Sequence, residues 1–342
     1  MTDSTKTESL YHPVSIGSVS IGGNLFLAPL AGYTDRAFRS ICIDRGASFT
    51  YTEMVSAEGL ARNSGNTERL MHRAENEDLL GIQIFMNEAS VAERCMPLLL
   101  AYRPTVIDIN CGCPVPKVVK TGAGSALLQF PEKIHQIVST IKGCCDVPVS
   151  VKIRLGWDAR SINYRETTDA ALSAKADMIT MHARTKSMGY SGTADWQALA
   201  DLKQYVASRA PHVPVFGSGD LFSAEAARRM LLDTKVDGVM FARGAMGNPF
   251  IFTDTIRLLT EGVQDKAAST RERTTAMLRQ LHLMGEDIGE RLACREMRKH
   301  ATSYLKGLPH ASQAKQELVH AATFAEYEGV CSRLAEESRT DL

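Results

Sequence analysis

The sequence has no long hydrophobic run and no excess of charge of either sign. No uninterrupted apolar stretch in its 342 residues approaches the ~20 residues that a membrane-spanning helix needs. Lys and Arg together number 39, and so do Asp and Glu, which makes the formal net charge zero. A nucleic-acid partner would therefore need a local basic patch. Residues 1–13 form a polar leader without an apolar signal core, so we expect a cytoplasmic protein with no membrane partner.

The cysteines do not have the spacing of a zinc site. The eight cysteines are scattered along the chain, which is typical of free thiols in a reducing compartment. Cys111 and Cys113 stand one residue apart, Cys144 and Cys145 are adjacent, and no second ligand pair accompanies them. We therefore expect no metal, and no obligate protein partner is evident.

The order of apolar segments predicts an α/β barrel. Eight strand candidates alternate with helical patterns, at residues 25–29, 49–53, 80–84, 106–110, 149–153, 178–181, 213–217 and 238–242. Eight such β-then-α units predict a (β/α)8 TIM barrel domain over residues 14–250, which begins with a small hairpin at 14–21. A doubly wound sheet is the alternative, but the Gly-x-Gly-x-x-Gly fingerprint after the first strand is missing.

After residue 250 the strand patterns stop. Charged helical patterns fill residues 251–342, with breaks expected at Gly262, Gly285, 307–309 and Gly329. We expect a small all-helical domain of three to five helices there.

The most informative stretch is residues 106–128. The apolar run 106–110 is followed at once by Cys111-Gly112-Cys113-Pro114, and Pro114 cannot continue a strand. This places a thiol just past the carboxyl end of a strand, where α/β barrels carry out their chemistry.

Polar residues end the other predicted strands and would surround the same barrel mouth. They are Glu53, Gln83, Asn110, Cys113, Lys152, Arg154, His182, Arg184, Ser218, Asp220 and Arg243. Lys152 stands between apolar neighbours on a predicted strand. A lysine at the end of a buried strand needs an anionic partner, which could be an acidic residue in a salt bridge at the barrel rim. The turns 217–220 and 242–244 contain glycines and lie at the usual phosphate corner of such barrels, although they could be simple tight turns. A lysine, a histidine, the Gln83 amide and a phosphate corner together favour FMN.

These residues resemble the tRNA-dihydrouridine synthases, and most of all their bacterial DusB-like branch. The resemblance extends over about residues 27–308, and its matching stretches are 28–32, 110–114, 120–128, 151–157, 190–196 and 237–250. It implies an FMN-dependent TIM barrel with a helical tRNA-binding domain, which reduces uridine in tRNA with NADPH.

The resemblance also assigns roles to residues of this chain. Cys113 matches the catalytic acid, and Asn110 matches a residue that faces the uracil; Lys117 and Arg184 are expected as further substrate contacts. The expected FMN contacts are Pro29, Gln83, Lys152, His182, Gly217, Ser218, Gly219, Asp220, Ala242, Arg243 and Gly244. Some positions depart from the family pattern: Ser218 replaces an asparagine, Ala183 and Ala242 replace glycines, and Cys111 replaces a methionine. Ser218 puts one cofactor hydrogen bond in doubt.

The implied chemistry suits a thiol. Hydride from N5 of the flavin would add to C6 of uracil, and C5 then needs a proton from a positioned acid. A thiol with a reference pKa of ~8.5 is mostly protonated near neutrality, although nearby lysines would lower that pKa. Two alternatives stay open: a free-pyrimidine or dihydroorotate-type flavin oxidoreductase, and a tRNA-binding module or folding chaperone with a vestigial flavin site.

A basic stripe in the helical region is the candidate RNA contact. Arg291, Arg295 and Lys299 recur every four positions, and Arg298 lies seven residues from Arg291, so one helix face would carry all four. Glu296 is the only acid between residues 291 and 306. The stripe could be an ordinary solvated face, but an enzyme that flips a base into a barrel must also grip the RNA beside it.

Overall fold

All eight predicted strands are present in the computed structural model, which describes residues 9–62 and 65–340. They are β3 (Leu25–Leu27), β4 (Phe49–Tyr51), β6 (Leu80–Phe85), β7 (Val106–Asn110), β8 (Val149–Arg154), β9 (Met178–His182), β10 (Val215–Ser218) and β11 (Gly238–Phe241). Each pairs in parallel with its neighbours, and because β3 joins β11 on one side and β4 on the other, the sheet closes on itself. The predicted TIM barrel is confirmed.

The amino-terminal end of the barrel is plugged. β1 (Val14–Ile16) and β2 (Val19–Ile21) form the predicted antiparallel hairpin. Ile16 and Ile21 join Phe26 and Phe216 in one buried cluster, and these two rings stack with centroids 4.2 Å apart. Residues 1–8 of the expected polar leader lie outside the described residues, while the Leu10 carbonyl accepts a hydrogen bond from Asn24 Nδ2 at 3.0 Å. The barrel is therefore open to ligands at the opposite end.

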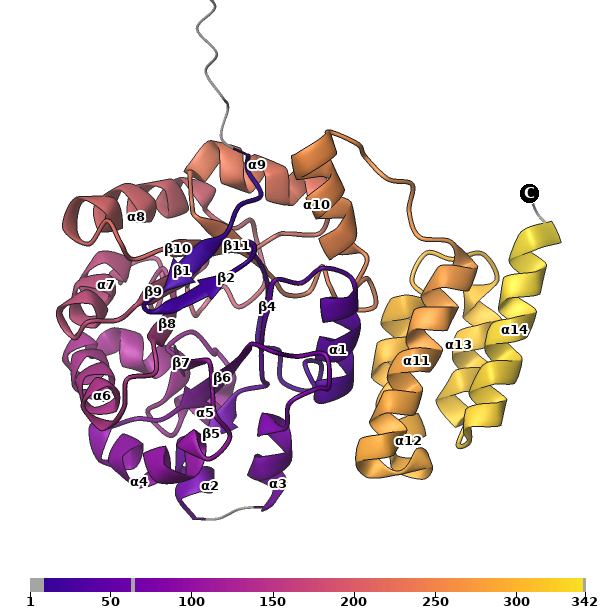
Figure 1. The fold of residues 1–342 in the computed structure, drawn as a ribbon, viewed down its shortest axis with the longest axis horizontal. Helices are drawn as coiled ribbons and strands as arrows, with labels where there is room; N and C mark the ends of the chain where they lie inside the picture. The colour runs from indigo at the N-terminus through magenta and orange to yellow at the C-terminus, as the bar shows by residue number, and fades with distance from the viewer. Residues whose placement is uncertain (1–8, 63–64, 341–342) are drawn as a thin grey trace, which may run out of the picture.

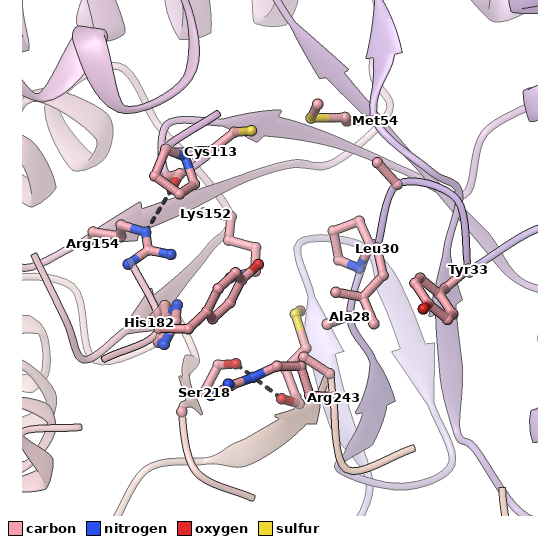
Figure 2. A pocket seen from close by; sticks show the side chains of 18 of the residues that line it. Ala28, Leu30, Tyr33, Met54, Cys113, Lys152, Arg154, His182, Ser218 and Arg243 are labelled. Carbon is pink, nitrogen blue, oxygen red and sulfur yellow. Dashed lines mark hydrogen bonds between the residues drawn. The ribbon is translucent and has the colours of Figure 1, made fainter. Parts of the chain in front are cut away.

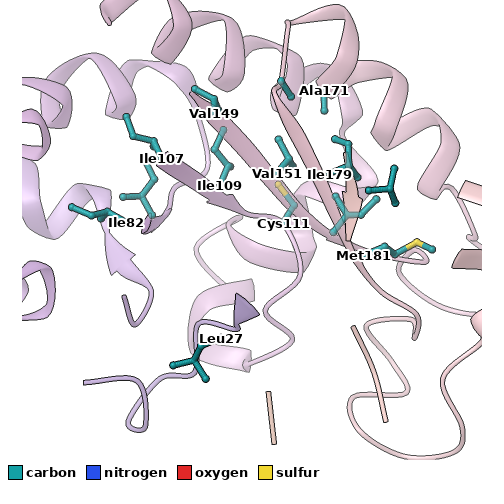
Figure 3. Packing of buried hydrophobic residues seen from close by; sticks show 14 of the residues in the cluster. Leu27, Ile82, Ile107, Ile109, Cys111, Val149, Val151, Ala171, Ile179 and Met181 are labelled. Atoms are coloured by element: carbon teal, nitrogen blue, oxygen red, sulfur yellow. The ribbon is translucent and has the colours of Figure 1, made fainter. Parts of the chain in front are cut away.

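Helices surround the strands (Figure 1). They are α1 (Arg36–Asp44), α4 (Ala89–Leu100), α6 (Pro131–Cys144), α7 (Tyr164–Ser173), α8 (Trp196–Arg209), α9 (Ala224–Thr234) and α10 (Ile251–Glu261). Outward-facing strand residues such as Ile107, Val149 and Val151 pack beneath these helices in the main core (Figure 3). Further short elements, which the sequence patterns did not predict, are β5 (Val55–Ser56), α2 (Ala57–Ala61), α3 (Gly65–Glu68), η1 (Arg69–Met71), α5 (Pro116–Val119) and η2 (Gly124–Gln129).

α10 packs with the barrel. Ile251 and Phe252 belong to the main core cluster, and the Thr253 hydroxyl donates to the Arg45 carbonyl beyond α1 at 2.7 Å. We therefore propose to place the domain boundary, expected between residues 250 and 251, in the connection after Glu261.

The helical region contains four helices among the residues that the structure describes. They are α11 (Thr270–Ile288), α12 (Glu290–Tyr304), α13 (Ala311–His320) and α14 (Phe324–Thr340). Two expected breaks were wrong, because Gly285 lies inside α11 and Gly329 inside α14. Gly285 is a packing glycine: a Cβ there would lie 2.3 Å from the Phe324 ring. The break between α11 and α12 falls instead at Gly289, whose φ is +76°.

The helical region packs against α1 and the barrel mouth. Ala37 and Ile41 of α1 share a buried cluster with residues of α11 and α12, and Arg36 forms an ion pair with Asp287 at 2.8 Å. A Cβ on Gly247, in the loop after β11, would lie 2.3 Å from the backbone of Ser303 on α12. α12 is thereby held close to the carboxyl ends of the strands. None of the described helices is long and apolar enough to cross a membrane.

Candidate functional site

A cavity of about 340 Å3 lies at the carboxyl ends of the barrel strands (Figure 2). Its volume falls within the range of small-molecule sites, ~300–1,000 Å3. Most residues expected at the barrel mouth line it, namely Pro29, Gln83, Asn110, Cys113, Lys152, His182, Ser218, Gly219, Asp220, Ala242, Arg243 and Gly244. Figure 2 shows Cys113, Lys152 and His182 on one side of the cavity, with Ala28, Leu30 and Tyr33 across from them.

The loop that carries Cys113 is held from three sides. The side-chain oxygen of Asn110 accepts hydrogen bonds from the backbone N–H of Gly112 at 3.1 Å and of Cys113 at 2.9 Å. Arg154 Nε donates to the Gly112 carbonyl at 2.6 Å, and the Ser125 hydroxyl donates to the Cys113 carbonyl at 2.7 Å. A loop with this many fixed contacts keeps its thiol in place.

The two cysteines of this loop have different environments. Cys111 is fully buried in the main core, and burial raises its pKa far above the ordinary value. Cys113 lines the cavity, and burial also raises its pKa, despite a backbone hydrogen bond and the charges of Arg154 and Lys152. Lys152 does lower the pKa of Cys113, as expected of a nearby lysine, but burial outweighs it and the net shift is upward. The Cys113 thiol is protonated at neutral pH and can act as an acid.

Lys152 presents an ammonium group to the cavity, and the charge of the buried Asp108 acts on it without forming a salt bridge. Strand alternation places Val151 and Ile153 in the outer core and Lys152 on the cavity, as predicted. Among the described residues, no carboxylate lies within 4.0 Å of its Nζ, so the rim salt bridge considered for this lysine is absent there. Burial, followed by the nearby charge of Arg154, lowers the pKa of Lys152 to about 8. An anionic ligand group beside it would be stabilised.

Gln83 and Asn110 are linked to each other and to a carboxylate beneath the cavity. Gln83 Nε2 donates to Asp108 at 2.6 Å, and Asn110 Nδ2 donates to Gln83 Oε1 at 2.8 Å. Asp108 also accepts from the Ser150 hydroxyl at 2.5 Å, and burial raises its pKa to about 6. Gln83 keeps one N–H for a ligand, whereas the second N–H of Asn110 faces Met54 Sδ at 3.9 Å, a weak acceptor that a ligand oxygen could replace.

His182 is neutral in this environment. Burial, and after it the charges of Arg154, Lys152, Arg184 and Arg243, hold its pKa well below the usual range. Its Nε2 lies 3.4 Å from the Arg184 guanidinium, which can only donate. Nε2 is therefore the acceptor, and Nδ1 carries the proton.

The turns after β10 and β11 form the predicted glycine-containing corner. A Cβ on Gly219, where φ is +123°, would lie 2.8 Å from Ala194, and one on Gly244 would lie 1.9 Å from the Leu221 carbonyl oxygen. The two loops thus approach each other as closely as glycine allows. The hydroxyl of Ser218 donates to the Met240 carbonyl at 3.1 Å, so this hydrogen is already engaged within the protein.

Several expected contacts lie outside the cavity lining. Gly217 is a packing glycine, since a Cβ there would lie 2.6 Å from Met230 Sδ. Arg184 is buried and donates to both Asp220 oxygens at 2.8 Å, so it supports the cavity wall. Lys117 is exposed on α5. Glu53 accepts from the Gly32 backbone at 2.5 Å and thereby fixes a neighbouring loop.

The basic stripe of α12 borders the cavity mouth. The Lys299 ammonium lies 3.7 Å from where a Cβ of Gly32 would be, in the loop that also contributes Ala31 and Tyr33 to the cavity. Arg291 and Arg295 are exposed on the same helix. Glu296 accepts from Lys299 at 2.8 Å, so part of the stripe's charge is balanced locally.

Arg298 departs from the expected common face. It is only partly exposed, and its guanidinium donates to the Ala321 carbonyl at 3.4 Å, toward the α13–α14 connection. Arg291, Arg295 and Lys299 therefore remain as the candidate RNA contacts of the stripe.

Three cavity residues had no assigned role in the sequence analysis. Arg154 braces the Cys113 loop and donates to the carbonyls of Thr185 and Gly189 at 3.0 and 2.9 Å. Tyr190 is half exposed at the mouth, with the Arg243 guanidinium 4.5 Å from its ring centroid. Tyr33 packs edge-on against the His300 ring at 5.1 Å and so links the cavity wall to α12. Arg154 ends a predicted strand, whereas the two tyrosines lie in loops without a periodic signal.

Comparisons with known proteins agree on one family. The family model described as dihydrouridine synthase (Dus) matches residues 26–339. A probable tRNA-dihydrouridine synthase of Treponema pallidum (strain Nichols) is 48% identical over 328 residues, covering 94% of this chain and 96% of the relative. A tRNA-dihydrouridine synthase B of Pseudomonas aeruginosa is 35% identical over 309 residues, covering 89% of this chain and 90% of the relative.

Solved structures share the fold at low sequence identity. A 2-naphthoyl-CoA reductase complex superposes with a TM-score of 0.57 at 9% identity, covering 75% of this chain and 52% of that one. Histamine dehydrogenase from Rhizobium sp. 4-9 superposes with a TM-score of 0.55 at 13% identity, covering 81% of this chain and 51% of that one. At such identities the likeness supports the barrel fold alone.

Proposed function

The chain belongs to the dihydrouridine synthase family, and on that premise we propose that it uses FMN and NADPH to reduce one uridine of tRNA to 5,6-dihydrouridine. The observation that carries this proposal is that the protonated thiol of Cys113 and the ammonium of Lys152, which forms no salt bridge among the described residues, line the same cavity. A flavin reductase that adds hydrogen across a C=C bond needs both an acid and a site for the cofactor's negative charge.

The donors around the cavity fit FMN. Lys152 would neutralise negative charge at the pyrimidine edge of the ring, and the free N–H of Gln83 would donate to a carbonyl there. The backbone at 218–220 and 242–244, with the guanidinium of Arg243, would receive the phosphate. When bound, FMN reduced by NADPH supplies the hydride that C6 of uracil accepts.

Cys113 completes the reduction. Adding hydride to C6 leaves negative charge at C5, because the C5=C6 bond is conjugated with the C4 carbonyl. The Cys113 Sγ–H then donates its proton to C5, and the raised pKa of this thiol keeps that proton in place at neutral pH. Asn110 also lines the cavity, and its second N–H, which faces the weak acceptor Met54 Sδ at 3.9 Å, would donate to an oxygen of the uracil.

The stripe of α12 gives the RNA a place to bind. A uridine must leave its stack to reach a cavity within a barrel mouth, so the surrounding backbone needs cationic contacts close by. Lys299, Arg295 and Arg291 lie on the helix that borders this mouth. We propose that they contact tRNA phosphates.

Two alternative functions predict different combinations of flavin binding and tRNA binding. A free-pyrimidine or dihydroorotate-type reductase would bind flavin but would not need tRNA. A tRNA-binding module or chaperone with a vestigial flavin site would bind tRNA without flavin. Neither accounts as well for a barrel carrying both the cavity groups and a basic stripe at its mouth.

The test begins with the colour of the purified protein. It should be yellow, mass spectrometry of the released cofactor should give FMN, and NADPH should bleach the flavin more efficiently than NADH does. Unmodified tRNA incubated with enzyme and NADPH should gain two mass units at one uridine, located by nuclease mapping. A colourless protein that binds tRNA, or a yellow one that reduces free pyrimidines alone, would contradict the proposal.

A further inference from the structure

We propose that Asp108 is a positioning residue that fixes the orientation of the Gln83 and Asn110 amides and thereby holds the Cys113 loop. Asp108 is completely buried and does not line the cavity, so it cannot touch a ligand there. Its importance for catalysis rests on the function proposed above, but its effect on the loop does not.

The two ends of this hydrogen-bonded chain determine its direction. At one end an ionised Asp108 carboxylate can only accept, so Gln83 must present its NH2 to it and its oxygen to Asn110. At the other end the backbone N–H groups of Gly112 and Cys113 can only donate, so Asn110 must present its oxygen to them. Only one orientation of the two amides satisfies both ends.

Reversing the chain would release the loop. If Gln83 turned its oxygen toward position 108, its NH2 would face the NH2 of Asn110. Asn110 would then have to turn as well, and its NH2 would meet the N–H groups of Gly112 and Cys113. Both loop hydrogen bonds would be lost, and buried donors without acceptors are unfavourable.

Ser150 allows a test of this direction. Its hydroxyl bonds the second Asp108 oxygen at 2.5 Å, and a hydroxyl can accept as well as donate. In Asp108→Asn, the new NH2 can donate to Ser150 while the oxygen still accepts from Gln83, so the chain keeps its direction. If Ser150→Ala is added, either orientation of the Asn amide leaves one of its polar groups without a partner, so position 108 no longer selects the orientation of the Gln83 amide.

The experiment measures amide hydrogen exchange at residue resolution in the full-length holoenzyme. Gly112 and Cys113 report on the loop, and the Cys111 N–H, which donates to the Lys152 carbonyl at 2.8 Å, is the internal control. Alkylation of the Cys113 thiol by iodoacetamide gives a second readout. Thermal melting confirms that each variant is folded.

The expected results follow from the orientation of the Gln83 and Asn110 amides, and not from the charge at position 108 alone. Asp108→Asn and Ser150→Ala should each keep the exchange of Gly112 and Cys113 within about twofold of the wild-type rate. The double variant, and Asp108→Leu, should accelerate both amides roughly 10-fold or more, with faster alkylation and little change at Cys111. If Asp108→Leu does not fold, the double variant decides alone.

Two outcomes would overturn the inference. The first is that Asp108→Asn accelerates exchange as much as the double variant does, which would mean that the carboxylate acts through its charge. Alternatively, the double variant could leave both amides protected, which would mean that the loop does not depend on position 108. Neither result would bear on whether the enzyme makes dihydrouridine, since no turnover is measured.

Discussion

Asn110 and Lys152 are direct partners in the register of β7 and β8. One holds the loop of Cys113 through its side-chain oxygen, and the other presents an ammonium to the cavity. Parallel pairing therefore brings the residue that supports the Cys113 loop and the ammonium proposed to face the cofactor to the same point on the barrel rim. Shifting either strand by one residue would turn that strand's own member of the pair away from the cavity.

Cys113→Ala should lower uridine reduction by ~10²-fold or more, the usual scale for losing a general acid. Flavin content and the slow oxidation of NADPH by O2 should stay nearly intact, because neither requires a proton at C5 of uracil. Dihydrouridine in tRNA, measured by mass spectrometry under single-turnover conditions, checks this.

Cys111→Ala is the matched control for that variant. Cys111 is buried in the main core, so its loss should cost some stability through a small cavity and leave proton donation in place. A comparable fall in dihydrouridine formation in the two variants would show that Cys113 is not the acid.

The sequence was most informative where chemistry and regular structure coincide. Lys152, Gln83 and Asn110 lie in strands, and because strand side chains alternate, their place on the cavity followed from their neighbours. Arg184 follows its strand by two residues and was expected at the substrate. Arg184 is instead buried, and it donates a hydrogen bond to Asp220, which lies 36 positions further along the chain. No local sequence pattern reveals a partner at that distance.

Lys152→Met should weaken FMN binding at pH 7.5 and remove most of its pH dependence above that value. In the free protein the pKa of Lys152 is about 8, and a bound anionic group would raise it. FMN should thus bind most tightly below pH 8, and its affinity should fall as the pH rises through 8, by at most ~10-fold per unit for one proton.

Flavin fluorescence quenching between pH 7.5 and 9.5 measures this dependence, in a range where the FMN phosphate stays fully ionised. The His182 pKa lies far below this range, so that side chain contributes no change. An equal pH dependence in wild type and Lys152→Met would exclude the proposed role of the ammonium.

Gly244→Ala should destabilise the protein by about 1–3 kcal/mol, the range for overpacking a tight site, and should reduce its flavin content. The added methyl would overlap the Leu221 carbonyl, so the two loops of the expected phosphate corner would have to separate. Gly22→Ala is the control, since nothing lies within 4 Å of its added Cβ. Differential scanning calorimetry and cofactor absorbance should change for Gly244→Ala alone.

The role of glycine shows where sequence reasoning reached its limit. Gly262 and Gly285 look alike in a helical pattern, yet the first has a φ of +70° at the end of α10, and the second lies inside α11 beneath Phe324. Which glycine ends a helix depends on a partner ring 39 residues further along the chain, and this is tertiary information.

Reversing the charge of Arg295 and Lys299 to Glu should weaken tRNA binding at least ~10-fold at moderate salt, because two phosphate contacts become repulsive. The slope of log affinity against log salt should become shallower by roughly 1.5–2, as expected for two lost contacts. Reduction of the flavin by NADPH without RNA should stay unchanged.

The control reverses Arg228 and Lys235, which are exposed on or beside α9, an outer barrel helix, so the change in net charge is the same. If both double variants lose equal affinity, long-range charge explains the effect and the RNA contacts lie elsewhere. If only the α12 variant loses affinity and salt dependence, α12 holds the RNA backbone beside the cavity into which the uridine turns.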